Sequence, residues 1–271
     1  MKVYWVFLLN ILCLGGIGWS APAAGQPVRA TAALRLLTVE EPPASYRNQH
    51  GEPDGYTVAV VKALQRELGD HQPIEIMPEG RALLTAQQDP NVLLFSFSRT
   101  PERESRYHWL LPVLQKRWQV VQRLGHPPVR SLDALRRLPA VGVVRGDVRE
   151  AYLQQQHFAN LVAVNMPLQA LQLLQAERVQ AIVIDQVELA HLLQQQAAGQ
   201  PVVQATWTFH QSEVYLLIPR QASPLLVQRW MQAAQRLRQS GELEAIAVSW
   251  QQKIARELGF TIERRGHLLL F

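Results

Sequence analysis

The residues best suited to binding an anion lie in one stretch, Ser96 to Arg103 (SFSRTPER). It follows the apolar run 92–95, which predicts a buried strand, and Thr100 and Pro101 suit the N-cap and first position of a helix. Arg103 falls in the first turn of that helix, where the macrodipole disfavours a cation. Serine hydroxyls, free helix N–H groups and a guanidinium together suit a carboxylate or phosphate. The alternative is a surface arginine beside a well-capped helix, and local sequence favours neither interpretation.

The elements around this stretch predict an α/β fold. Apolar strand-like runs alternate with amphipathic helical segments along most of the chain, including a short helix at 81–88. The segment 107–112 is expected to be irregular, with separate strands at 118–124 and 214–218. Strands that alternate with helices indicate mostly parallel sheets with helices on both faces. In such sheets, ligands bind outside the carboxyl ends of the strands.

Polar side chains gather at four of these predicted strand ends. Each group taken alone is also consistent with a helix cap or a turn residue, and their shared position at the carboxyl ends is the stronger indication of a site. The groups are Glu40-Glu41, Ser96 with Ser98, Arg145-Gly146-Asp147, and Asp185.

Composition and missing motifs exclude several classes of function. The chain has 271 residues and a net charge of +5, and its basic residues are scattered rather than clustered, so nucleic-acid binding is not predicted. The sequence contains no Walker loop, no Rossmann glycine fingerprint and no G-x-S-x-G turn. Its eight histidines are dispersed without metal-ligand spacing. We therefore expect no metal, no cofactor and no catalytic residue.

The first residues have the pattern of a secretory signal peptide. Lys2 precedes an apolar run at 3–17, and Ala21-Pro22-Ala23 supplies a small-x-small cleavage pattern, so residues 1–23 are expected to be removed on export. An uncleaved anchor is disfavoured by the short run and by Asn10 inside it. Cys13, the only cysteine, lies in this run, so the mature protein is expected in the periplasm without a disulfide.

Four stretches together resemble family 3 of the extracellular solute-binding proteins, the periplasmic receptors typified by polar amino-acid binding proteins. The resemblance covers roughly residues 34–256, and the motifs keep the order and spacing of the family. They are LRLLTVEEPPASYRNQHGEPDG (34–55), SRTPER (98–103), VGVVRGD (141–147) and RVQAIVID (178–185).

The resemblance implies a two-lobed periplasmic-binding-protein-like fold of type II. Each lobe is then a mostly parallel sheet flanked by helices, and two hinge strands join the lobes so that they close on a ligand. The first lobe is expected to combine 34–116 with 213–260, and the second to comprise 120–207.

The family also implies roles for particular residues. The arginine matching Arg103 pairs with the α-carboxylate of an amino-acid ligand, and the residues matching Ser96 and Ser98 add backbone and hydroxyl contacts. The aspartate matching Asp185 takes the α-ammonium group. A forked cation at one end and a carboxylate at the other suit a zwitterion.

The chain departs from the family pattern in ways that point to a larger or more charged ligand. The aromatic residue that often covers the ligand is not evident at 78–81, and Ala44 follows the double proline where family members often have an aromatic. Asp147 occupies a position that is commonly a small hydroxyl residue, and Glu41 and Arg81 add charge near the mouth of the site. These three residues are therefore included as candidate ligand contacts.

The expected function is capture of a small carboxylate-bearing ligand, an amino acid or a related compound, by a monomeric protein. The partner is then either an ABC permease or a membrane sensor. The alternative is an enzyme of the same fold, similar to the periplasmic dehydratases of cyclohexadienyl acids such as arogenate, with Glu41 or Asp147 as general acid. The sensory module of a larger receptor is a third interpretation, disfavoured because the last residues, 268–271, are too few to span a membrane.

Overall fold

The computed structural model of the chain describes Met1, residues 34–196, Gly199 and residues 202–271. The expected signal peptide, Met1 apart, lies outside the described residues, as does Cys13. The strands are β1 (Arg35–Thr38), β2 (Tyr46–Arg47), β3 (Pro53–Asp54), β4 (Ile74–Ile76), β5 (Val92–Ser98), β6 (Tyr107–Arg123), β7 (Val141–Val144), β8 (Leu161–Val164), β9 (Ala181–Ile184), β10 (Val203–Pro219), β11 (Glu263–Arg265) and β12 (Leu268–Leu270). The helices are α1 (Tyr56–Leu68), α2 (Glu79–Gln88), α3 (Pro101–Glu104), α4 (Leu132–Arg136), α5 (Val148–Gln155), α6 (Pro167–Gln175), α7 (Gln186–Gln194), α8 (Pro224–Gln239) and α9 (Glu242–Leu258).

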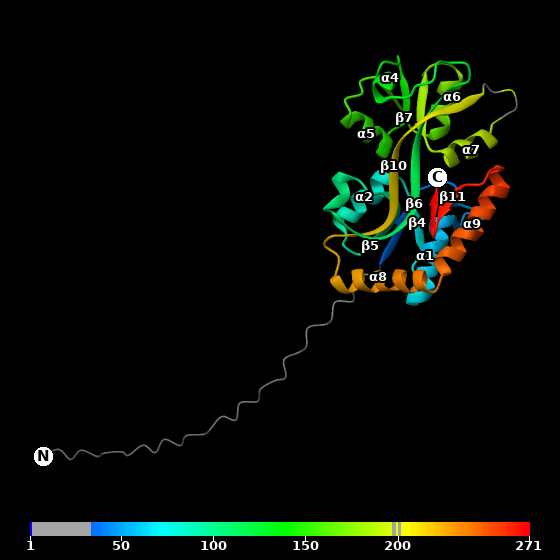
Figure 1. Cartoon of the computed structure of the whole chain (residues 1–271). Helices are drawn as coiled ribbons and strands as arrows, with labels where there is room; N and C mark the ends of the chain where they lie inside the picture. Colours follow the sequence, from blue (N-terminus) through cyan, green and yellow to red (C-terminus); the bar gives the residue numbers. More distant parts are fainter. Residues whose placement is uncertain (2–33, 197–198, 200–201) are drawn as a thin grey trace. The chain divides into compact units, whose positions relative to one another are not determined.

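The principal sheet of the described residues is mixed, with the strand order β4-β1-β5-β10-β6-β9-β7-β8 (Figure 1). At one end, β1 lies between β4 and β5 and is parallel to both. At the other end, β7 lies between β8 and β9 and is also parallel to both. Antiparallel β10 and β6 separate these two parallel groups, which we name the first lobe (β4, β1, β5) and the second lobe (β8, β7, β9) with the helices packed on them.

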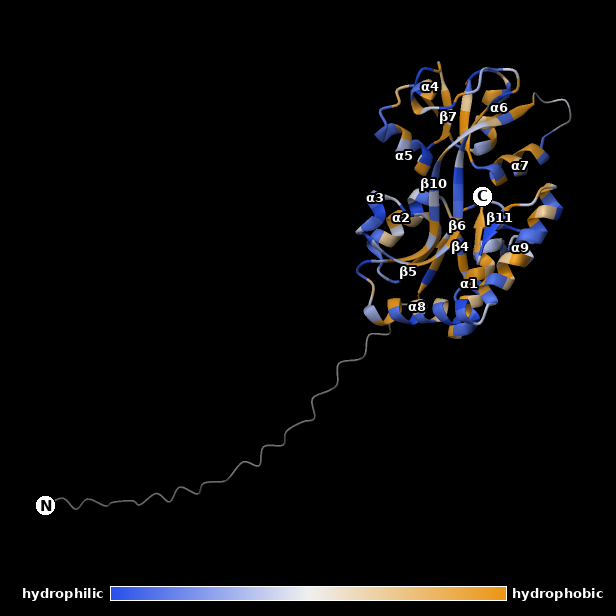
Figure 2. Cartoon of the chain, viewed as in Figure 1, coloured by the Kyte–Doolittle hydropathy of each residue, from blue (hydrophilic) through white to orange (hydrophobic). Residues whose placement is uncertain are grey.

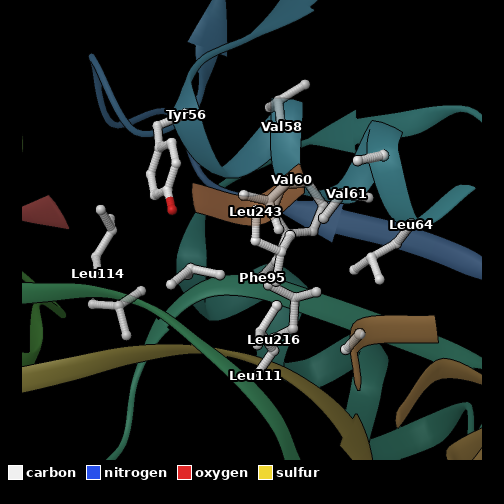
Figure 3. Packing of buried hydrophobic residues seen from close by; sticks show 14 of the residues in the cluster. Tyr56, Val58, Val60, Val61, Leu64, Phe95, Leu111, Leu114, Leu216 and Leu243 are labelled. Atoms are coloured by element: carbon white, nitrogen blue, oxygen red, sulfur yellow. The ribbon is translucent and has the colours of Figure 1, made fainter. Parts of the chain in front are cut away.

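The core of the first lobe includes the apolar face of α1, whose apolar residues recur with helical periodicity. Val60, Val61 and Leu64 lie on one face of the helix and pack against Phe95 of β5 and against residues of β6, α8 and α9 (Figure 3). The helix ends at Gly69, whose φ of 62° gives the left-handed C-cap that glycine adopts without steric cost.

The second lobe has its own hydrophobic clusters on the two faces of its strands. Val141 and Val143 of β7 pack with Leu135 of α4 and Leu153 of α5 on one side. On the other side, Leu171 and its neighbours on α6 and α7 cover the strands. Separate cores on either side of β6 and β10 confirm the two-lobed α/β architecture with two connecting strands. The lobe boundaries expected from the sequence stay a prediction.

The two connecting strands are longer than the sequence predicted. The segment 107–112, expected to be irregular, is part of β6, which pairs with β10 from Tyr107↔Pro219 to Arg123↔Val203. The sequence signal failed because Pro112 lacks an N–H and normally interrupts a strand. Here Pro112 pairs with Tyr215 at a register shift, where a bulge tolerates the missing donor. Figure 2 shows that the middle of β6 is hydrophilic and lies between two apolar stretches.

A C-terminal hairpin adds a strand to β6. In it, β12 runs parallel to β6, with Leu269 opposite Leu114, and β11 pairs with β12. The N–H of Phe271 donates to the Gln115 carbonyl and the N–H of Arg117 donates to the Phe271 carbonyl, each at 2.8 Å. The side chain of Phe271 is buried in the first-lobe core. In the part of the chain that the structure describes, no helix has both the length and the hydrophobicity of a membrane span.

Candidate functional site

The stretch that carries Arg103 folds as its sequence predicts. Strand β5 ends at Ser98, Thr100 is the N-cap of α3, and Arg103 is the third residue of that helix. Its guanidinium donates from Nη1 to the Ser98 carbonyl at 3.3 Å and from Nη2 to Glu79 Oε1 at 2.5 Å. The Arg103 side chain is 15% exposed, so this cation is largely withdrawn from water. Burial raises the pKa of Glu79, and Arg103 opposes that rise.

A second ion pair joins the turn after β1 to the middle of β6. Glu41 lies in a turn closed by a backbone bridge to Ser45, and its carboxylate accepts a hydrogen bond from the ammonium group of Lys116. Burial raises the pKa of Glu41 to about 7, and Glu188 and Asp185 add to the rise while Lys116 opposes it. For Lys116, burial acts to lower the pKa, but Glu41 and Asp185 hold it above the ordinary value.

The second lobe contributes a buried arginine with three carboxylate partners. Asp147 caps α5, and Arg149 in the first turn donates to Asp147 Oδ2 at 2.7 Å and to Glu188 Oε2 at 2.8 Å. Asp185 caps α7 and lies 4.0 Å from Arg149. Burial acts to raise the pKa of Asp147, but Arg149 holds it below the ordinary value. For Glu188, burial raises the pKa and Arg149 opposes the rise.

These groups form one set, which we call the ionic cluster. Carboxylate oxygens of Glu41, Asp185 and Glu188 lie within 4.8 Å of one another, although Glu41 belongs to the first lobe and the other two to the second. The Arg103–Glu79 pair is included because the charges of Asp147 and Lys116 contribute to the pKa of Glu79. The members are Glu41, Glu79, Arg103, Lys116, Asp147, Arg149, Asp185 and Glu188. Burial is the largest cause of the raised pKa values of Glu41, Glu79 and Glu188, and the neighbouring carboxylates add to the rise.

The start of α7 is held against the first lobe by packing. Val187 lies between Asp185 and Glu188 in the chain, and its side chain is fully buried in the first-lobe core rather than in its own lobe. Further along the same side, Gln194 of α7 donates to the Glu257 carbonyl of α9. Hydrophobic contact of Val187 with the first-lobe core therefore helps to place the second-lobe carboxylates beside Glu41.

Four of the seven residues expected from the sequence lie in the ionic cluster: Glu41, Arg103, Asp147 and Asp185. Ser98 is buried next to it and contributes its carbonyl to Arg103. The other two are placed differently. Arg81 is an exposed residue of α2. The Ser96 hydroxyl is buried against the hydroxyls of Thr57 and Ser45, at 2.7 and 3.2 Å.

The sequence analysis missed four members of the cluster: Glu79, Lys116, Arg149 and Glu188. Arg149 had a signal, because it is a cation in the first turn of a helix, the feature that singled out Arg103. Lys116 lies inside β6 beside Arg117, in a segment that the sequence did not assign to a strand. Glu79 and Glu188 lie in the first turns of α2 and α7, where acids are common for helix stability alone.

Arg99 anchors helix α3. Its guanidinium donates to both carboxylate oxygens of Glu104, at 2.8 and 2.5 Å. It also lies 5.4 Å from the ring centroids of Trp109 and of Tyr215. The last residue of α3 is thereby held to β6 and β10 by an ion pair and two cation–π contacts. Arg99 supports the helix that carries Arg103.

The site is defined by its side-chain chemistry rather than by a large cavity. A cavity of about 600 Å³ lies between the start of β6 and α8, and one of about 660 Å³ lies beside β8 and α6. Neither is lined by a member of the ionic cluster. Two members of the cluster, Arg149 and Glu188, line a cavity of only about 10 Å³ beside β7 and β9.

Comparison with known proteins gives the family. Residues 34–253 match the model of the bacterial extracellular solute-binding proteins, family 3, and the chain belongs to this family. No curated protein sequence matches the chain.

The solved structures that match show the same fold at low sequence identity. A histidine kinase sensor domain with similarity to periplasmic binding proteins has a TM-score of 0.72 at 19% identity, over 80% of this chain and 95% of that chain. A variant of ArgBP from T. maritima has a TM-score of 0.68 at 15% identity, over 80% and 95%. The GluR0 ligand-binding core from Nostoc punctiforme in complex with L-glutamate has a TM-score of 0.66 at 22% identity, over 80% and 98%. The fold is that of the type II periplasmic binding proteins.

Proposed function

We propose that this protein captures a small carboxylate-bearing solute, an amino acid or a related compound, at the ionic cluster. Arg103 receives the carboxylate, and Asp185 with Glu41 and Glu188 receives the cationic group. The observation that carries this assignment is that the largely buried Arg103 guanidinium lies on the last residue of β5, while three closely spaced carboxylates, Glu41, Asp185 and Glu188, follow the ends of β1 and β9. An arginine fork and a group of carboxylates match the two charges of a zwitterion.

Ligand exchange requires the lobes to separate, and the topology supports a hinge. Among the strands that the structure describes, only β6 and β10 run through both lobes, so rotation about their central residues opens the cluster. We place the lobes at 34–116 with 213–260 and at 120–207. Contacts that must break on opening include the 2.9 Å hydrogen bond from Gln155 of α5 to Glu102 of α3.

We further propose that the protein acts in the periplasm after removal of residues 1–23. It either delivers its solute to an ABC permease or presents it to a membrane sensor. The structural relatives support both outcomes, since they include a putative L-cystine ABC transporter protein from Listeria monocytogenes and the sensor domain of a histidine kinase. The protein is proposed to act as a monomer.

A thermal-shift screen of the mature protein against amino acids, dicarboxylates and amines tests the assignment. A ligand at about one hundred times its dissociation constant stabilises the folded state by roughly 2.7 kcal/mol. The shift is expected to be lost in Arg103→Ala and kept in Arg106→Ala, a control at an exposed arginine two residues beyond α3. A shift that persists undiminished in Arg103→Ala contradicts the role of this arginine.

A second candidate is an enzyme of the same fold, because Glu41 has the protonation behaviour of a general acid. Its pKa is raised to about 7, and a general acid works best when its pKa is near the working pH. Incubation with arogenate, followed by the absorbance of an aromatic product, tests for a dehydratase of cyclohexadienyl acids. Product formation that is lost in Glu41→Gln favours the enzyme, and binding without turnover favours the receptor.

A further inference from the structure

Both groups that are proposed to receive a zwitterion are already paired with side chains of the chain itself. The Arg103 guanidinium holds the carboxylate of Glu79 at 2.5 Å. On the other side, the ammonium group of Lys116 lies on Glu41 and is influenced by the charge of Asp185. One resident carboxylate and one resident ammonium therefore make the contacts that the two ends of an amino acid would make.

The Glu79–Arg103 pair is more than a helix-capping contact. An acid at the first position of α2 is favoured by the helix dipole without any partner, so local stability alone does not need Arg103. The Glu79 side chain instead reaches an arginine 24 positions away and is 29% exposed. A partly buried ion pair such as this one adds little net stability, because desolvation offsets the attraction. The pair is thus poorly explained by folding and well explained by exchange with another carboxylate.

We propose that Glu79 is a tethered carboxylate that occupies Arg103 in place of the ligand's carboxylate and must be displaced when the ligand binds. Glu79 is then a specificity-determining residue of this site. The inference rests on the proposed function, since it takes Arg103 as the carboxylate receptor.

The displaced carboxylate decides which ligands bind best. The ionic cluster already contains more carboxylates than cations. The negative charge of Asp147 repels an ionised Glu79 and so raises the pKa of Glu79. A ligand that takes Arg103 leaves Glu79 without its cation, so the ligand must bring positive charge together with its carboxylate. Zwitterionic and basic amino acids meet this requirement. Dicarboxylates such as succinate do not, because they add two negative charges and supply no cation.

Chemical rescue tests the exchange directly. In Glu79→Ala the Arg103 guanidinium loses its partner and a small space opens beside it, which free acetate can fill. Sodium acetate is expected to raise the melting temperature of Glu79→Ala above the value in sodium chloride of equal ionic strength. Wild type should show no such difference. The double variant Glu79→Ala/Arg103→Ala should also show no difference, because the guanidinium that would bind acetate has been removed.

The matched control removes the acid from a surface ion pair of similar geometry. Arg236 and Glu67 are 2.5 Å apart on α8 and α1, and Glu67→Ala leaves an exposed arginine that water already solvates. Acetate should leave this variant unchanged. Rescue of equal size in wild type, in Glu67→Ala or in the double variant overturns the proposal.

An isosteric variant keeps the proposal testable if Glu79→Ala does not fold. In Glu79→Gln the competing charge is gone, so Arg103 is available in a larger fraction of molecules. If the competitor leaves Arg103 free in about one molecule in ten, removing it tightens carboxylate binding about tenfold. The gain should be larger for succinate than for L-lysine, measured by titration calorimetry. Equal or weaker binding of both compounds contradicts the role of Glu79.

The outcome separates this inference from the proposed function. Acetate rescue in Glu79→Ala, with no binding of any amino acid to wild type, keeps Glu79 as a displaceable carboxylate and rejects amino-acid capture. Amino-acid binding that depends on Arg103, with no acetate rescue and no effect of Glu79→Gln, keeps the receptor and rejects the tethered carboxylate.

Discussion

Arg149 Nη1 donates to Glu188 Oε2 at 2.8 Å and thereby ties the first turn of α5 to the first turn of α7. The same guanidinium holds both oxygens of Asp147, at 2.9 and 2.7 Å. Its side chain is 7% exposed, and burial opposes its charge, but the surrounding carboxylates raise the pKa of Arg149 well above the ordinary value. The second-lobe half of the ionic cluster is organised around this one cation.

Replacing Arg149 by methionine is expected to destabilise the protein strongly. The variant Arg149→Met keeps the volume of the side chain but leaves Asp147 and Glu188 buried without a cation. Removing one partner of a buried ion pair costs about 3–5 kcal/mol. Urea unfolding of the mature protein measures the loss. The control Arg145→Met changes an exposed arginine four residues earlier and should stay within about 0.5 kcal/mol of wild type. Similar small losses in both variants would mean that the pairs at Arg149 add nothing.

Glu41 is expected to make the stability fall as the pH rises through the acidic range. Its pKa is about 7 in the folded protein against an ordinary 4.5, so the folded state binds the proton more tightly than the unfolded state. Between about pH 4.5 and 7 the unfolded chain therefore loses its proton first, and the free energy of unfolding decreases with pH. The total change attributable to Glu41 is about 3 kcal/mol. Urea unfolding at pH 5, 6 and 7 measures this slope.

Substitution isolates the contribution of Glu41 to this slope. Glu41→Gln removes the titrating group and should flatten the dependence, while Glu40→Gln, at the exposed neighbour, should leave it unchanged. Burial also raises the pKa values of Glu79 and Glu188, so a smaller slope of the same sign is expected to remain. A slope that is identical in wild type and Glu41→Gln would contradict the raised pKa.

The C-terminal hairpin is expected to be essential for the first-lobe core. Phe271 is 3% exposed, and both its backbone N–H and its backbone carbonyl are hydrogen-bonded to β6. Phe271→Ala removes a buried aromatic ring, which costs about 3–5 kcal/mol because a cavity remains. Leu225→Ala, at a leucine of α8 that is 75% exposed, is the control and should change little. Thermal unfolding of both variants checks this, and equal melting temperatures would show that the hairpin does not support the core.

Ser96 is expected to act through stability rather than through ligand contact. Its hydroxyl joins Thr57 and Ser45 in a buried hydrogen-bonded group, and its φ of 71° turns the backbone of β5 at that point. Ser96→Ala loses these hydrogen bonds at a cost of about 1 kcal/mol. The affinity of the Ser96→Ala variant for any ligand found in the screen should equal that of wild type. Loss of binding at unchanged stability would instead support the ligand contact expected from the sequence.

Local signals in the sequence were sufficient for most elements. Ser131, Asp147 and Asp185 accept hydrogen bonds from the first turns of the helices they precede, as their residue types indicate. Such N-cap residues can be identified from the sequence because a cap depends only on residues within one turn of the helix. The 17-residue strands β6 and β10 were predicted only in part, because their pairing joins residues about one hundred positions apart and tolerates a proline at a bulge.

The sequence by itself determined the alternation of strands and helices, the family and the position of Arg103 at a strand end, since each is carried by contiguous residues. Only the tertiary structure decided which side chains pair with one another. It paired Arg103 with Glu79, placed Lys116 on Glu41, and turned the Ser96 hydroxyl toward Thr57. Ion pairing and burial depend on distances between segments that are remote in the chain, and neither residue type nor local spacing encodes those distances.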